Sequence, residues 1–124
     1  MRIPIYPADL NPQKGFKRIA KVIHRDWPGS EPVNLSAARE ILARCFGYKD
    51  YHDVTRSADG WPDDASAPEV EDLRAAILVS LANKLYAESS SISVDLERLT
   101  TFVESLPLKV LQTYRLSRAN HPEG

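Results

Sequence analysis

Residues 34–56 read NLSAAREILARCFGYKDYHDVTR and carry the clearest helical signal in the chain. Asn34 or Ser36 can cap the start of a helix, because either side chain accepts a hydrogen bond from a backbone N–H of the first turn. Gly47 is a natural stop, since glycine adopts the left-handed conformation at a helix end without steric penalty. Between these signals, apolar residues recur at helical spacing and predict one buried stripe. They are Ala38, Ile41, Leu42, Cys45 and Phe46.

A short third helix is expected directly after this glycine turn. Asp50 can cap its start, and the helix would run from Tyr51 to about Arg56. Aromatic and apolar side chains around the turn would hold it against the core. They are Tyr48, Tyr51 and Val54.

The same segment has the proportions of a helix–turn–helix motif, and Ala43 precedes Gly47 by the usual four residues. Asp53, however, stands where that motif has an apolar residue, six positions after the glycine. The short helix also offers few long cationic side chains, which suits base reading in the major groove poorly. A compact helical hairpin is the alternative interpretation, and it is the one we favour.

An amphipathic helix precedes this segment, from about Gln13 to Arg25. Pro12 suits its first turn, and Pro28 ends it, because the residue before a proline avoids the α conformation. At about 100° per residue, one face is apolar and the opposite face is basic. The apolar face holds Phe16, Ile19, Ala20 and Ile23, and the basic face holds Lys14, Lys17, Arg18, Lys21 and Arg25.

Residues 57–68 have the composition of a linker, with Trp61 docked against one side. A long helix is expected to follow, from about Glu69 to Ala87. Val79 and Tyr86 point away from its main apolar face, which is typical of a central helix or of one packed by a partner chain. That face holds Val70, Leu73, Ile77, Leu81 and Leu85, with Leu78 at its edge.

A fifth helix is expected from Ser93, and a sixth from Pro107 to about Leu116. In the fifth, apolar residues recur in the 4-3-4-3-4 spacing of a coiled-coil seam. Pro107 interrupts this pattern, so a long continuous coiled coil is not expected. The seam residues are Ile92, Leu96, Leu99, Val103, Leu106 and Val110.

These patterns predict an all-α fold with five or six helices. An N-terminal helical module with a helix, glycine turn and short helix would be followed by a C-terminal helical hairpin. Only Ile3 to Tyr6 could form a strand, and the flanking prolines restrict it to a sheet edge or an extended arm. We predict a basic module over 1–56, a linker over 57–68, an acidic hairpin with the last helix over 69–118, and a frayed tail over 119–124. One compact domain overall is the alternative.

The near-neutral net charge of −1, from 16 basic and 17 acidic residues, conceals a segregation along the chain. Residues 1–56 hold ten basic and six acidic side chains, a balance of +4. Residues 57–106 hold three and ten, a balance of −7, and residues 107–124 hold three and one, a balance of +2. Such asymmetry suggests a polyanion-binding half and an acidic half.

The basic face of the first long helix is the best candidate for a functional surface, because no acidic residue interrupts it. Such a face attracts phosphates at long range and binds them with release of counterions. Arg44 and Lys49 would extend the patch. A solvated helix face without a ligand is the alternative reading of the same pattern.

A second candidate surface belongs to the acidic half, where a protein partner or a second copy of the chain would bind. The residues predicted for it lie on the fourth and fifth helices. They are Val79, Tyr86, Leu96, Leu99 and Val103.

Two segments resemble a known bacterial module. They are residues 16–21, FKRIAK, and the pattern LSxAxExLARxxGYKDYHDV over residues 35–54. The chain is similar there to the N-terminal segment of glyoxalase-related proteins and to short stand-alone bacterial proteins of unknown role. The resemblance covers about residues 14–57, and members usually have tryptophan or a similar aromatic where Tyr51 stands. It implies a shared fold for that part and transfers no catalytic residue.

Catalytic, metal and cofactor sites are not expected. His24, His52 and His121 are scattered without an i, i+4 pair, and the single cysteine, Cys45, falls in an apolar stripe. No phosphate-binding glycine loop or nucleophile motif is present, and the single cysteine favours the cytoplasm. No apolar run approaches the roughly 18 residues of a membrane span.

The sequence therefore predicts a small, non-enzymatic, cytoplasmic regulatory protein of bacterial type that forms a homodimer. Its expected partner is DNA or RNA, bound through phosphate contacts. The alternative is a protein-interaction module, antitoxin-like or inhibitor-like, that works through the acidic half.

Overall fold

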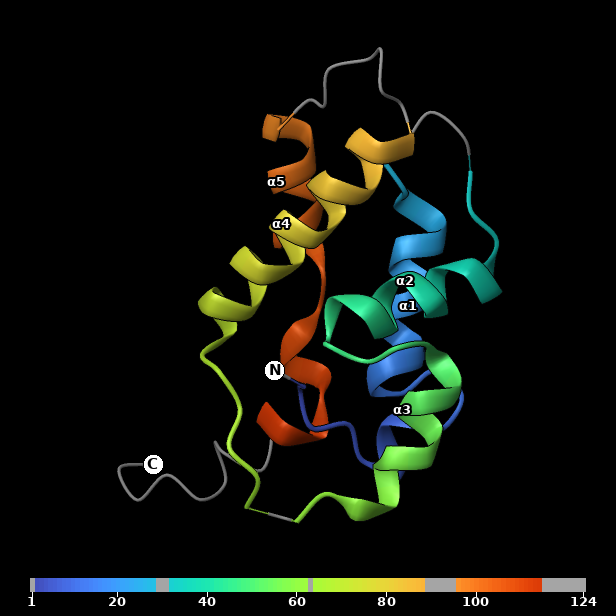
Figure 1. Cartoon of the computed structure of the whole chain (residues 1–124), viewed down its shortest axis with the longest axis vertical. Coiled ribbons are helices and arrows are strands. Elements are labelled where there is room, and N and C mark those ends of the chain that lie inside the picture. The colour runs from blue at the N-terminus through green and yellow to red at the C-terminus, as the bar shows by residue number, and fades with distance from the viewer. Residues whose placement is uncertain (1, 29–31, 63, 89–95, 115–124) are drawn as a thin grey trace.

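The computed structural model describes residues 2–28, 32–62, 64–88 and 96–114, and over these residues the chain is all-α with no strand (Figure 1). This confirms the predicted fold class. The α-helices are α1 (Gly15–Asp26), α2 (Leu35–Cys45), α3 (Tyr51–Ser57), α4 (Val70–Glu88) and α5 (Leu96–Ser105). The 3-10 helices are η1 (Pro7–Leu10), η2 (Ala58–Gly60) and η3 (Leu108–Val110).

The helical elements form two groups (Figure 1). Helices α1, α2 and α3 lie together on one side, and α4 and α5 pack against each other on the other side. The segment that includes η3 runs between the two groups and touches α1. One continuous cluster of buried side chains draws on both groups, from Phe16 and Leu42 to Ile77 and Leu99.

The predicted caps explain where α2 and α3 begin. Oδ1 of Asn34 accepts a hydrogen bond from the Ala37 N–H at 2.7 Å, so Asn34 caps α2. Oδ1 of Asp50 accepts from the Asp53 N–H at 2.8 Å and caps α3 in the same way. Gly47 ends the intervening turn with a φ of 92°, a conformation that favours glycine.

This assignment of the α2 cap gives a matched pair of variants. Asn34→Ala should lower the free energy of unfolding by about 1 kcal/mol, because a first-turn N–H loses its acceptor. Ser36 lies inside the first turn of α2 and is exposed. Ser36→Ala should therefore change the free energy of unfolding by less than about 0.5 kcal/mol. Urea denaturation followed by circular dichroism measures both. Equal losses would contradict the assignment of the cap to Asn34.

The N-terminal residues Ile3 to Tyr6 form an extended arm rather than a strand, and their side chains enter the core. Ile3 and Ile5 are buried. The Ile3 N–H donates to the Phe46 carbonyl at 3.0 Å, and its own carbonyl accepts from the Tyr48 hydroxyl at 2.7 Å. The arm makes isolated hydrogen bonds instead of the regular hydrogen-bond ladder of a β-strand, because Pro4 and Pro7 have no N–H to donate.

The end of the chain differs from the predicted sixth helix. Instead of one helix opening at Pro107, the 3-10 turn η3 comes first, and residues 112–114 are helical where the described part ends. Leu108 and Leu111 are fully buried in this segment, so it serves as core as well as connection. The predicted start of the fifth helix at Ser93, the seam residue Ile92, the end at Leu116 and the tail over 119–124 lie outside the described residues.

Trp27 joins the two groups at the end of α1. Its ring packs edge-on against Phe102 of α5, with the centroids 6.2 Å apart. Trp61 also docks as predicted, and its indole N–H donates to the Tyr48 hydroxyl at 3.0 Å. In the part of the chain that the structure describes, no helix combines the length and the apolar character needed to cross a bilayer.

Candidate nucleic-acid interface

The basic face of α1 is exposed because the opposite face is committed to the core. Phe16, Ile19 and Ile23 are fully buried, and the helical period turns the residues between them outward. Four of the five predicted cations are exposed, and Lys17 is half-buried at the edge of the stripe. We call Lys14, Lys17, Arg18, Lys21 and Arg25 the α1 basic stripe.

Most of this stripe is electrostatically uncompensated. Among the described residues, none of Lys14, Lys17, Arg18 or Lys21 has an ion-pair partner. Arg25 differs, because its guanidinium holds Asp26 at 2.9 Å. The hydrogen bond between them raises the pKa of Arg25 and lowers that of Asp26. Within the part of the chain that the structure describes, the cations of the stripe without an ion-pair partner are therefore the other four.

Arg44 and Lys49, the predicted extension, lie on other elements. Arg44 is in the last turn of α2, and Lys49 is in the turn before α3. Both are exposed. His24 is exposed on α1, and the Val33 carbonyl lies 2.7 Å from its Nδ1. The last turn of α2 and the turn that follows it thus carry a pair of exposed cations separate from the α1 basic stripe.

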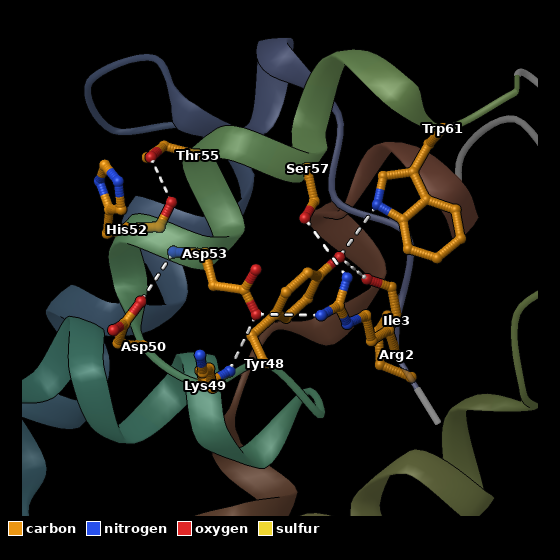
Figure 2. Close-up of polar contacts among 10 residues, drawn as sticks. All are labelled: Arg2, Ile3, Tyr48, Lys49, Asp50, His52, Asp53, Thr55, Ser57 and Trp61. Carbon is orange, nitrogen blue, oxygen red and sulfur yellow. Dashed lines mark hydrogen bonds and ion pairs between the residues drawn. The ribbon is translucent and has the colours of Figure 1, made fainter.

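The α3 surface is organised by a cluster around Arg2 and Asp53 (Figure 2). Oδ2 of Asp53 accepts from the Lys49 N–H at 3.1 Å and from Nη2 of Arg2 at 3.2 Å. The Lys49 N–H is the main cause that lowers the pKa of the Asp53 carboxyl, with the Arg2 charge adding to it. The Arg2 guanidinium also lies over the Tyr48 ring, 5.2 Å from its centroid. Asp53 therefore fastens the N-terminal arm to α3, which explains an acidic residue where a DNA-reading motif has an apolar one.

The five residues predicted for a partner surface divide into two groups. Val79, Tyr86 and Leu96 are 60%, 64% and 58% exposed, the large apolar side chains with the greatest exposure in the described chain. Leu99 and Val103 are only 1% and 2% exposed, because this side of α5 packs into the chain's own core. These two seam positions stabilise the monomer and leave no surface for a partner to contact.

Two features of the surface were missed by sequence reasoning. The Arg39 guanidinium lies over the Tyr51 ring, 5.8 Å from its centroid, and Tyr51 in turn stacks on Phe16. Ala75, Ala76 and Asn83 are exposed beside Val79 and Tyr86 on α4. The second feature has a sequence signal, since between Asp72 and Lys84 the only charged residue is Arg74.

The remaining chemistry-bearing groups of the described residues lie apart from one another. Burial raises the pKa of the Cys45 thiol to about 11, opposite to the shift of a nucleophilic cysteine. Within the described ranges, no cluster of three His, Cys, Asp or Glu side chains could hold a metal ion. No protein-family model, curated protein or solved structure matches this chain. The resemblance of residues 14–57 to the glyoxalase-related segment stays a prediction.

Proposed function

We propose that this chain is a small, non-enzymatic regulatory protein of bacterial type that binds nucleic acid through the α1 basic stripe. The observation that carries the proposal is a set of four cations that have no ion-pair partner among the described residues, on α1 and its N-cap, where the other face of the helix is buried. They are Lys14, Lys17, Arg18 and Lys21. Because the apolar face of α1 is buried, these charges all face outward on the opposite side of the helix.

The length of the stripe fits contacts with several phosphates. From the N-cap Lys14 to Arg25, α1 rises about 16 Å. Duplex DNA carries one phosphate charge per roughly 1.7 Å of its axis. The stripe consists of Lys and Arg alone, with no Asn or Gln to pair with adenine and no carboxylate to accept from cytosine. Binding would therefore depend on phosphates, with little preference for sequence, and with dissociation constants on the order of 10⁻⁴–10⁻⁶ M at physiological salt.

A pair of double variants tests this proposal. Lys14→Gln/Lys21→Gln removes two charges from the stripe, and Arg56→Gln/Lys109→Gln removes two exposed charges elsewhere. Fluorescence anisotropy with labelled 20-base-pair DNA and RNA duplexes measures binding at low salt. The stripe variant should bind on the order of tenfold more weakly, because two counterion-releasing contacts are lost, while the control should change by less than about threefold.

The same assay separates the outcomes. Equal weakening by both double variants would mean that only net charge matters and would overturn the α1 assignment, as would the absence of binding by the wild type. Arg44→Gln/Lys49→Gln then decides whether the α2–α3 turn extends the interface. A preference between the DNA and RNA duplexes would identify the nucleic acid.

A protein partner remains the alternative proposal, in an antitoxin-like or inhibitor-like role for the acidic half. The exposure of Val79 and Tyr86 favours it, since apolar side chains on a helix face are typical of interfaces. A stoichiometric partner whose binding is lost in Glu71→Gln/Asp72→Gln and kept in Lys14→Gln/Lys21→Gln would favour this function over nucleic-acid binding.

A further inference from the structure

The outer face of α4 is apolar although it points away from the core. Leu73, Ile77 and Leu81 fill the inner face. On the opposite side, residues recur in the 4-3-4 spacing of a helix-pairing seam. The seam holds Ala75, Val79, Ala82 and Tyr86; Ala82 is half-buried against the edge of the core, and the other three are exposed.

The outer face of α4 is poor in charged residues along most of its length and carries acidic residues at its start, as the centre and rim of a protein–protein interface do. Exposed carboxylates occur at its start, on Glu71 and Asp72. From residue 75 to residue 87 the helix has no acidic residue, and its one charged residue, Lys84, is half-buried. Depletion of charge at the centre distinguishes protein–protein interfaces from ordinary surface.

We propose that a second copy of this chain covers the α4 outer face, with the two α4 helices antiparallel and a two-fold axis at Val79. Val79 is the midpoint of Val70–Glu88, so this axis brings Asp72 of one copy opposite Tyr86 of the other. A carboxylate then faces a hydroxyl donor at both ends of the interface. Such self-complementarity is what a two-fold interface requires, because each copy supplies the same patch.

The charges also select the antiparallel direction. In a parallel pair, the carboxylates of Glu71 and Asp72 from both copies would lie together and repel each other. In an antiparallel pair they are separated by the length of the helix, which removes this repulsion. The two helix dipoles then also oppose each other favourably. Alanines at positions 75 and 82 allow the helix axes to approach to roughly 8 Å.

The expected dimer is weak. A 19-residue helix is about 28 Å long, and a single helix face covers less than the roughly 800 Å² per partner of a standard stable interface. We expect a dissociation constant on the order of 10 μM, so that monomer and dimer exchange in the range accessible to sedimentation.

Cysteine cross-linking of the full-length chain tests the geometry. Under mild oxidation, Val79→Cys should cross-link to itself, because the axis places the two residues 79 together. Ala75→Cys and Asn83→Cys should cross-link to each other when mixed, and less to themselves. Thr101→Cys, exposed on α5, is the matched control and should remain monomeric. The native Cys45 is buried and should not contribute.

Sedimentation equilibrium tests the affinity without an engineered cysteine. Val79→Glu should weaken the dimer at least about tenfold, since two carboxylates would meet at the axis, whereas Thr101→Glu should leave it unchanged. Circular dichroism should find both variants folded, because both positions are exposed. The proposal is overturned if the wild type is a monomer at 200 μM, if Val79→Cys cross-links no faster than Thr101→Cys, or if Ala75→Cys and Asn83→Cys each prefer themselves. None of these results depends on nucleic-acid binding.

Discussion

Asp9→Ala is expected to lower the free energy of unfolding by about 3 kcal/mol. Asp9 lies in η1 and is only 2% exposed. Its Oδ2 accepts from the Tyr6 N–H at 3.0 Å, and its Oδ1 accepts from the Gln112 N–H at 2.9 Å. The carboxylate therefore ties the start of the chain to its last described segment. Alanine leaves both N–H groups without this acceptor, and each buried unpaired donor costs about 1–3 kcal/mol.

Two effects bound the size of this loss. Removing a buried carboxylate also removes its desolvation cost, which offsets part of the destabilisation. The space left by the Asp9 carboxylate would also stay unfilled, because the adjacent residue Gly15 has no side chain. Urea denaturation should show a midpoint lowered by about 1.5–2 M. Asp59→Ala, at an exposed position, is the control, and a loss below about 1 kcal/mol for Asp9→Ala would contradict the role of Asp9.

Arg74→Met should destabilise the α4–α5 pair by about 2 kcal/mol. Nη1 of Arg74 lies 2.8 Å from the Val103 carbonyl oxygen, 3.1 Å from that of Leu106 and 3.3 Å from that of Glu104. The last carbonyls of a helix have no partner within the helix, and a cation there also opposes the negative end of the dipole. Arg74 thus caps α5 from the neighbouring helix.

Methionine is chosen because it keeps most of the apolar volume while removing the donors and the charge. Arg74→Lys is the matched variant, since an ammonium group can still donate to one or two of the carbonyls, and it should recover about half of the loss. Hydrogen exchange should show faster opening of the last turn of α5 in Arg74→Met. Unchanged exchange there, with a loss confined to global stability, would contradict the capping role.

The helices could be predicted because each is specified by local signals. Asn34, Asp50 and Gly47 mark helix ends by their own side-chain or backbone chemistry, and the periodic apolar residues of α1, α2 and α4 identify their buried faces. The outward direction of Val79 and Tyr86 follows from the same periodicity, as does the exposure of the α1 basic stripe. These features require no knowledge of which segments meet in space.

The remaining features depend on tertiary contacts that no local pattern encodes. Leu99 and Val103 have the spacing of an intermolecular seam, but α5 packs against α4 and both residues lie in the monomer's own core. Asp9 and Arg74 look like ordinary surface charges, yet their partners lie 103 and 29–32 residues away. The pairing of Arg25 with Asp26 also reduces the charge of one predicted phosphate contact.

The salt dependence of duplex binding tests the central proposal most directly. With four to five phosphate contacts from the α1 basic stripe, the logarithm of the binding constant should fall with the logarithm of salt concentration with a slope of about −4. Lys14→Gln/Lys21→Gln should reduce this slope to about −2, and Arg56→Gln/Lys109→Gln should leave it unchanged. A wild-type slope near zero, or the same slope in the wild type and the stripe variant, would contradict binding through α1.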